Sequence, residues 1–158
     1  MARLRESIAR VEQELAGVAE QDERVALLRT IPGVGPRLAE TIVAVIDDPH
    51  RFKSGKQVGC YAGLTPRRYQ SGSMDRQGRI SGAGHGLLRS LLVEVSWLGR
   101  RYNAWMKGVY ERALRGTGSR KKVAIVALAR RLLVVCWAML RDGTRWRDPC
   151  GARLTLAA

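Results

Sequence analysis

The sequence predicts an all-α fold of about six helices around one core. Three observations lead to this prediction. The chain has 158 residues, which is enough for one domain with a sizeable core. Its hydrophobic fraction, 46%, is that of a globular protein. Every apolar segment repeats at helical rather than strand spacing. We therefore expect no sheet larger than two short strands.

The N-terminal segment is predicted to be one helix over residues 3–28, of which residues 1–24 form a coiled-coil-like unit. Four-three spacing relates its apolar side chains, which is the seam of a coiled coil: Leu4, Ile8, Val11, Leu15, Val18 and Val25. Asp22 falls on this seam and weakens it. The alternative is an ordinary amphipathic helix that covers its own domain.

A main domain is predicted over residues 25–142, followed by a basic tail over 143–158. After residue 47 the apolar patterns indicate helices over 55–62, 87–101, 102–115 and 120–141. Ser54, His85 and Ser119 are the expected caps or openings of three of them. Asp47 and Asp48 are expected to cap a turn, and Trp146 to dock on the core. The run 123–140 is apolar, but Arg130 and Arg131 at its centre favour a buried core helix over a membrane span.

The composition of the chain is unusual in its large excess of positive charge. The net charge is +14, and residues 50–158 alone carry 22 basic and 5 acidic side chains. Such a field points to a polyanion, above all nucleic acid, whose phosphates supply most non-specific affinity. The alternative is a basic protein whose charge serves no partner. The three cysteines form no CxxC pair, so we expect reduced thiols, no zinc site and a cytoplasmic location.

Residues 24–47 carry the most specific signal, two apolar helices joined by Ile31-Pro32-Gly33-Val34-Gly35. This is the helix-hairpin-helix pattern. Its glycines permit a tight turn that a phosphate can approach, and the N–H groups of the second helix then face that phosphate. We expect contacts from Gly33, Val34 and Gly35, with a charged contact from Arg37. The alternative is a simple turn that uses glycine for geometry.

Residues 63–86 are predicted to form a long loop that is rich in glycine and arginine. Ser71 lies between basic side chains that could contact phosphate, namely Arg67, Arg68, Arg76 and Arg79. From the residues alone, Ser71 is either a nucleophile or an ordinary loop serine, and the arginines are either phosphate ligands or solvated. Lys121 and Lys122 begin the last long helix, where positive charge opposes the helix dipole unless an anion binds.

Three segments in combination, LRTIPGVGPRLAETIVAVIDDPHRF, FKSGKQVGCYAGLTPRRYQSGS and GRISGAGHGLLRSLLVEVSW, resemble the C-terminal domain of bridge-RNA-guided insertion-sequence transposases. These enzymes are relatives of the Piv-type DNA invertases. The resemblance covers roughly residues 25–142. It implies duplex DNA as a partner, as the basic field does, and a guide RNA as a further candidate partner. The heptad spacing of the N-terminal helix separately predicts a homo-oligomer formed through that helix.

The resemblance also implies a catalytic serine in the Ser-Gly step after Gly-Leu-x-Pro, which is Ser71 here. In the family, an N-terminal RuvC-like domain supplies a carboxylate site for a divalent metal, which we expect to be Mg²⁺. Residues 1–49 carry no such carboxylate set, so we expect no cofactor or metal in this chain and no DNA cleavage by it alone. The alternative function is a non-catalytic helix-hairpin-helix module that binds nucleic acid.

Overall fold

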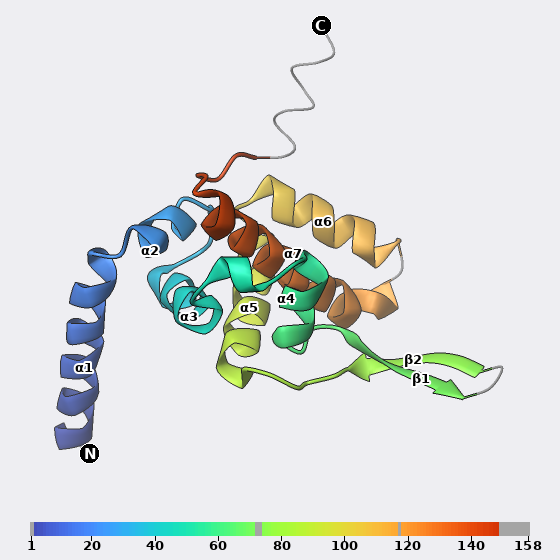
Figure 1. Ribbon diagram of the computed structural model, residues 1–158, viewed down its shortest axis with the longest axis horizontal. Coiled ribbons are helices and arrows are strands. Elements are labelled where there is room, and N and C mark those ends of the chain that lie inside the picture. The colour runs from blue at the N-terminus through green and yellow to red at the C-terminus, as the bar shows by residue number, and fades with distance from the viewer. Residues whose placement is uncertain (1, 72–73, 117, 149–158) are drawn as a thin grey trace, which may run out of the picture.

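The structure is a computed structural model that describes residues 2–71, 74–116 and 118–148. It is mostly helical, as predicted, and its one described sheet has two strands. A central helix, α7 (Lys121–Asp142), makes its most extensive helix contacts with four other helices (Figure 1): α2 (Glu23–Leu28), α4 (Gly55–Tyr61), α5 (Gly86–Gly99) and α6 (Ala104–Leu114). Helix α3 (Pro36–Ile46) packs against α2 and α5, and two 3₁₀ turns, η1 (Pro49–Arg51) and η2 (Gly118–Arg120), precede α4 and α7.

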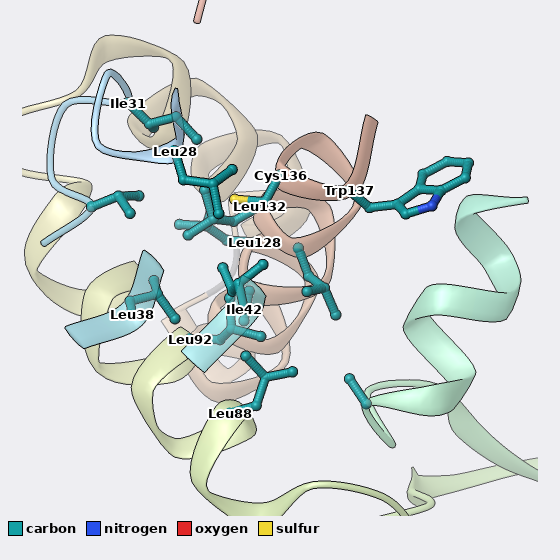
Figure 2. Close-up of a cluster of buried hydrophobic side chains, with 14 of the residues drawn as sticks. Leu28, Ile31, Leu38, Ile42, Leu88, Leu92, Leu128, Leu132, Cys136 and Trp137 are labelled. Atoms are coloured by element: carbon teal, nitrogen blue, oxygen red, sulfur yellow. The ribbon is translucent and has the colours of Figure 1, made fainter. Parts of the chain in front are cut away.

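The core lies around α7, whose inner face is apolar along its whole length. Leu128, Leu132 and Cys136 are fully buried there and meet side chains from α2, α3 and α5 (Figure 2). Each such leucine contributes about 1.5–3 kcal/mol through burial. Trp137 points to the other side, where its indole N–H donates to the Pro49 carbonyl at 2.8 Å.

Helix α7 is long and apolar enough to pass a length-and-composition test for a membrane span. Half of its most apolar window is buried inside the domain, as in a core helix. Arg131 is exposed, and the side chain of Arg130 lies against Gly59 of α4. Gly55, one turn earlier, lies against Val134, so α4 runs antiparallel to α7 at close range. This arrangement agrees with the predicted core helix.

The N-terminal segment differs from the predicted single helix. It consists of α1 (Ala2–Glu20) and α2, separated at Gln21 and Asp22. Asp22 has an extended backbone and its carboxylate accepts the N–H of Arg24, so it caps α2 and ends the continuous helix. Helix α1 projects from the body (Figure 1), and Leu4, Ile8 and Val11 of the predicted seam are 62%, 49% and 51% exposed.

The prediction of a long loop over residues 63–86 was also wrong. Strands β1 (Pro66–Ser71) and β2 (Met74–Ile80) form an antiparallel hairpin that projects from the helical body (Figure 1). We call this hairpin the arm. Its strands carry too few apolar residues for an alternating pattern to show. The sequence signal that predicts it is the two-residue step Gly72-Ser73 between them, a common hairpin connection.

Most of the other predicted boundaries hold to within two residues. Helix α5 begins at Gly86 with the His85 side chain accepting the N–H of Leu88, and Asp48 caps η1 through the N–H of His50. Ser119 does not cap the last helix, because it lies inside η2 and Arg120 occupies the cap position. Trp146 docks as predicted, edge-on to Trp105 with ring centres 5.2 Å apart. The tail beyond residue 148 lies outside the described residues.

Candidate nucleic-acid interface

The turn between α2 and α3 is built by two glycines with different tasks. Gly33 has a left-handed φ of +96°, and a Cβ there would stand 3.3 Å from the backbone of Gly99 on α5. Gly35 has an extended backbone with open space around it and occupies the cap position of α3. Val34, between them, is buried and holds the turn on the core.

The start of α3 is arranged as an anion site would be. Pro36 has no N–H, and Ala39 already bonds to the Gly35 carbonyl at 3.2 Å. A helix leaves its first N–H groups without intrahelical partners, which here are those of Arg37 and Leu38. Gly35 has no side chain that could cap them. Arg37 is exposed in this first turn, so a guanidinium stands beside two outward N–H groups.

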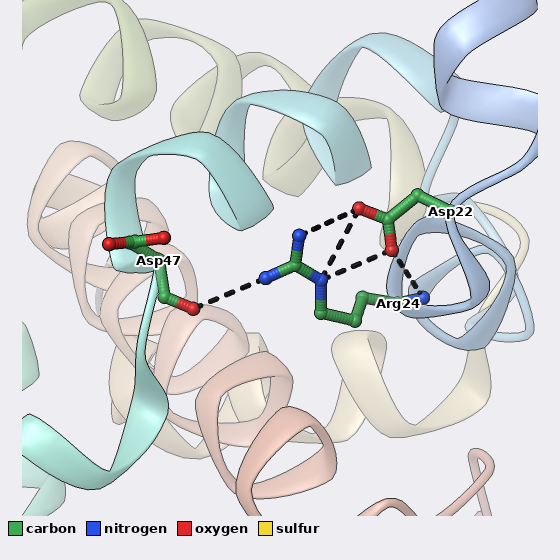
Figure 3. A network of polar contacts seen from close by, with 3 residues as sticks. All are labelled: Asp22, Arg24 and Asp47. Carbon is green, nitrogen blue, oxygen red and sulfur yellow. Dashed lines mark hydrogen bonds and ion pairs between the residues drawn. The ribbon is translucent and has the colours of Figure 1, made fainter.

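A polar brace joins the two helices that flank this turn. Arg24 bonds the Asp22 carboxylate at 2.8 Å and reaches the Asp47 carbonyl at the end of α3, 3.4 Å away (Figure 3). The hydrogen bond from Arg24 lowers the pKa of Asp22; the Arg24 side chain is exposed and that of Asp22 is partly exposed. The brace therefore orients α2 against α3 and adds little stability.

Two residues of this region escaped the sequence reasoning. Arg29, which ends α2 next to the turn, is exposed and adds a second guanidinium. Asn103, the cap of α6, donates from its side-chain amide to the Pro32 carbonyl at 3.0 Å and is buried. Basic residues at a helix end are a signal that could have found Arg29. Asn103 lies 71 positions from Pro32, so no local pattern predicts the contact.

The arm carries the remaining predicted arginines. Arg67 donates to the Ser81 carbonyl at 2.9 Å, which ties β1 to the segment that follows β2, and Arg79 is exposed. Arg68 pairs with Gln77 and Arg76 with Tyr69 in the strand register. The side chains of Arg68 and Arg76 lie outside the described part, so their predicted contacts stay predictions.

Ser71 is the last residue of β1 and pairs with Met74 across the end of the arm. It is exposed. The six residues of β1 that end at Ser71 span about 20 Å at 3.3 Å per residue, so Ser71 lies far from the helical body. His85, the imidazole nearest in sequence, lies beyond the base of the arm and accepts a hydrogen bond as the cap of α5. It therefore does not sit beside the hydroxyl of Ser71.

The structure does not bring all predicted contacts together. The turn between α2 and α3 contacts Gly99 and Asn103, at the C-terminal end of α5. The base of the arm is formed where residues 61–63 contact Ala83 and Gly84, just before α5 begins. The 14 residues of α5 separate the two by about 21 Å at 1.5 Å per residue. Lys121 and Lys122 are exposed and lie on the arm side, because α4 leads into the arm while running antiparallel to α7.

Two separate basic surfaces result. We call them the turn surface (Arg29, Gly33, Gly35 and Arg37) and the arm surface (Arg67, Arg79, Lys121 and Lys122, with Ser71 at the tip). Both are formed by exposed cations and neither is an enclosed pocket. Among the described residues, no group of three or more His, Cys, Asp or Glu side chains could hold a metal ion. Such surfaces suit an extended polyanion better than a small substrate.

Comparison with known proteins gives one family. Residues 25–111 match the model of the transposase IS116/IS110/IS902 family. The chain is 39% identical over 128 residues to the pilin gene-inverting protein of Moraxella lacunata, which covers 78% of this chain and 38% of that protein. It is 33% identical over 155 residues to the transposase for insertion sequence element IS1111A of Coxiella burnetii, covering 93% of this chain and 40% of that protein.

A third relative is the transposase for insertion sequence element IS1328 of Yersinia enterocolitica, 30% identical over 141 residues, 88% of this chain and 42% of that protein. The chain thus spans about two fifths of the length of the curated relatives that it matches. The match to the family model begins at Val25 and includes the turn surface and the whole arm.

Proposed function

This chain belongs to the IS116/IS110/IS902 transposase family, and we propose that it is the DNA-binding, serine-bearing part of an insertion-sequence transposase or recombinase. The observation that carries the proposal is the arm, which holds an exposed serine at its tip and exposed cations at its base. Its relatives are named as transposases and as a gene-inverting protein, and both activities require DNA phosphodiesters to be broken and rejoined.

The proposed chemistry is nucleophilic catalysis by Ser71. Its Oγ attacks a DNA phosphorus, the Oγ–P bond forms, and the bond from phosphorus to the 3′-oxygen breaks. The 3′-oxygen leaves as a hydroxyl and takes up the proton that the serine loses. A 3′-hydroxyl of the partner strand later attacks the phosphoserine and restores Ser71. Guanidinium groups of the arm would stabilise the charge on the transferring phosphoryl group.

Ser71 needs help that the described residues do not place beside it. A serine hydroxyl is a weak nucleophile at neutral pH until a base or a metal activates it. His85 is engaged as a cap, and Ser71 stands at the far end of the arm. We therefore propose that a partner domain supplies the activating groups, with a divalent metal, Mg²⁺, held by carboxylates as the family resemblance implies. A guide RNA is a further proposed partner.

The position of Ser71, which has no activating group described beside it, favours a second candidate: a non-catalytic module that binds nucleic acid. In that case the turn surface binds backbone phosphates and Ser71 is an ordinary residue of the arm. Both candidates predict DNA binding by this chain, and only the first predicts a covalent intermediate. Two experiments separate them.

The first experiment measures binding of the chain to duplex DNA as salt is raised. We expect the logarithm of the affinity to fall steeply with the logarithm of salt concentration, and Arg37→Ala to reduce that slope by about 0.9 because one phosphate contact is lost. Arg10→Ala, on the projecting helix α1, is the matched control and should leave the slope unchanged. An affinity that does not change with salt would contradict both candidates.

The second experiment joins this chain to the N-terminal part of a family member and looks for a covalent adduct with DNA. We expect an adduct that disappears in Ser71→Ala, while duplex binding persists because the turn surface is intact. Ser81→Ala at the base of the arm is the control, since the Ser81 carbonyl, not its hydroxyl, accepts from Arg67. An adduct that survives Ser71→Ala would assign the nucleophile elsewhere.

We also propose that α1 mediates self-association. Leu4, Ile8 and Val11 are exposed at four-three spacing on a helix that touches the body only near its end. Two such helices would bury these side chains against each other. Ile8→Glu should convert an associated species to a monomer in sedimentation, and Ser7→Glu on the same helix should not. A native chain that sediments as a monomer would contradict this proposal.

A further inference from the structure

An aromatic pair lies between η1 and the end of α4, next to the base of the arm. The rings of Phe52 and Tyr61 meet edge to face with centres 5.4 Å apart. The guanidinium of Arg51 covers both, 4.6 Å from the Phe52 centre and 4.8 Å from that of Tyr61. Arg51 is itself anchored, because it donates to the Val45 carbonyl at 2.9 Å. The three side chains therefore hold one another in place.

This pair forms part of the wall of an open groove of about 740 Å³. The groove is lined by Phe52, Ser54, Lys56, Gln57, Cys60 and Tyr61. Tyr61 is 45% exposed, so a large part of a fixed aromatic ring borders the groove. Lys56 and Cys60 are one turn apart on α4 and are also exposed. The groove thus offers an aromatic surface, a cation and an amide within one small area.

The charge around this groove favours an anionic ligand. From Pro49 to Met74 the sequence has no acidic residue and five basic ones, at positions 51, 53, 56, 67 and 68. A second hollow, over α5, is lined by Trp97 and Arg89 but also by Glu94. An aromatic ring beside lysines, with no carboxylate in this stretch of chain, is the combination used to hold single-stranded nucleic acid.

We propose that this groove binds an unpaired base of single-stranded DNA, which stacks on Tyr61 while Lys56 contacts an adjoining phosphate. Bases in a duplex are stacked on one another, so only a base outside a duplex can cover the ring. DNA rather than RNA is the ligand because the groove ends at the base of the arm. There the Tyr61 carbonyl meets Gly84, and the arm carries Ser71 about 20 Å further out.

This inference rests on the proposed function, since a strand that is opened during exchange is DNA near the attacked phosphodiester. The groove would hold that strand about 20 Å from Ser71, which is the length of the arm. It would thus favour opened DNA over intact duplex, which neither the turn surface nor the arm surface does by itself.

The test compares a thymidine oligonucleotide of about twelve nucleotides with a duplex of the same length, using the full chain. Tyr61→Ala should weaken binding of the single strand roughly 5- to 150-fold, the range for loss of one stacked base, and change duplex binding less than about twofold. Tyr61→Phe keeps the ring and should bind the single strand as the native chain does. Tyr102→Ala removes an exposed tyrosine from another part of the molecule and should have no effect.

Cys60 provides a second readout within the native chain. Its thiol is exposed in the groove, whereas Cys136 is buried. The thymidine oligonucleotide should slow alkylation of Cys60 by a maleimide, followed on the Cys60 peptide by mass spectrometry, and should no longer do so in Tyr61→Ala. Equal protection by a uridine ribo-oligonucleotide would overturn the assignment to DNA.

The failures of the two proposals are distinguishable. Single-strand binding that is unchanged in Tyr61→Ala, with duplex binding intact, overturns the groove and leaves the proposed function standing. Loss of duplex and single-strand binding together in Tyr61→Ala, with a lowered melting temperature, shows a structural role for the ring and also overturns the groove. A native chain that binds neither DNA overturns both proposals.

Discussion

Asn103 shows how one side chain can determine the position of a candidate binding surface. Its carbonyl oxygen accepts the N–H groups of Trp105 and Met106 and caps α6, while its amide donates to Pro32 in the turn. The residue is buried, so the two cap bonds are shielded from water, whereas the bond to exposed Pro32 is partly buried. Asn103 thus adds a side-chain hydrogen bond from the start of α6 to the turn, whose buried Val34 packs on the core.

We expect Asn103→Ala to lower the free energy of unfolding by about 2–3 kcal/mol, because a cap is lost and the Pro32 carbonyl loses its donor. Asn103→Ser is the matched variant. Serine caps a helix well but is too short to reach Pro32, so it should recover roughly the cap contribution alone. Urea denaturation measures both. Equal losses in the two variants would show that the cap contributes nothing.

Cys136 predicts a specific pH dependence. Burial raises the pKa of its thiol from 9.0 to about 12, so the folded chain keeps a proton that the unfolded chain releases above pH 9. The stability contributed by the neutral thiol is complete below pH 9 and falls as pH rises toward 12, by about 1.4 kcal/mol per pH unit. The stability difference between the native chain and Cys136→Ala, measured in urea, should therefore shrink above pH 9. A difference independent of pH would contradict the assignment.

At the scale of elements, the arm is held at its base by close backbone contacts. Gly63 has φ +69° and faces the Ala83 carbonyl, and Gly84 has φ +98° and faces the Tyr61 carbonyl. A Cβ at either position would collide with backbone. Gly82 also has a left-handed φ, +64°, but only open space around it. Alanine at Gly82 would therefore meet only the strain of a left-handed backbone, whereas alanine at Gly63 or Gly84 would also collide with neighbouring backbone.

Gly82→Ala should cost about 1 kcal/mol, the penalty of a left-handed alanine. Gly84→Ala should cost several times as much, since the segment before α5 and the end of α4, which meet at the base of the arm, would have to separate. Hydrogen exchange of the arm amides should rise more in Gly84→Ala than in Gly82→Ala. Similar exchange in the two variants would mean that the close approach does not hold the arm.

At the scale of the whole molecule, the two basic surfaces lie at opposite ends of α5. The turn and the base of the arm are about 21 Å apart, which is roughly six base pairs at 3.4 Å each. With the arm extended along the DNA, the span approaches about 40 Å, or twelve base pairs. A single duplex long enough to meet both ends would therefore bind more tightly than a short one.

We expect affinity to rise with duplex length up to about twelve base pairs and then to level off, after correction for the number of binding positions. In Arg37→Ala this rise should be smaller, because the turn surface contributes less. Arg79→Ala should reduce it in the same way from the other end. Fluorescence anisotropy over a length series measures the effect. An identical length dependence in all three proteins would show that the two surfaces do not share one duplex.

Local signals in the sequence determined most of the helical part of this protein. Period-3.6 apolar spacing located α3, α5, α6 and α7, and the Pro-Gly-Val-Gly step located the turn, because these features depend on neighbouring residues. The basic field and the family followed from the residues as well. The same reasoning was wrong about one helix over 3–28, since Asp22 caps α2 instead of continuing it, and about a loop where the arm stands.

Only the tertiary structure decided how the candidate residues are distributed. The contacts that place them join positions far apart in the chain, such as Asn103 with Pro32 and Tyr61 with Gly84. No local pattern encodes these contacts, because they depend on how the helices pack around α7. That packing separates the turn from the arm by the length of α5, sets Ser71 at the end of a projecting hairpin, and leaves the ring of Tyr61 beside an open groove.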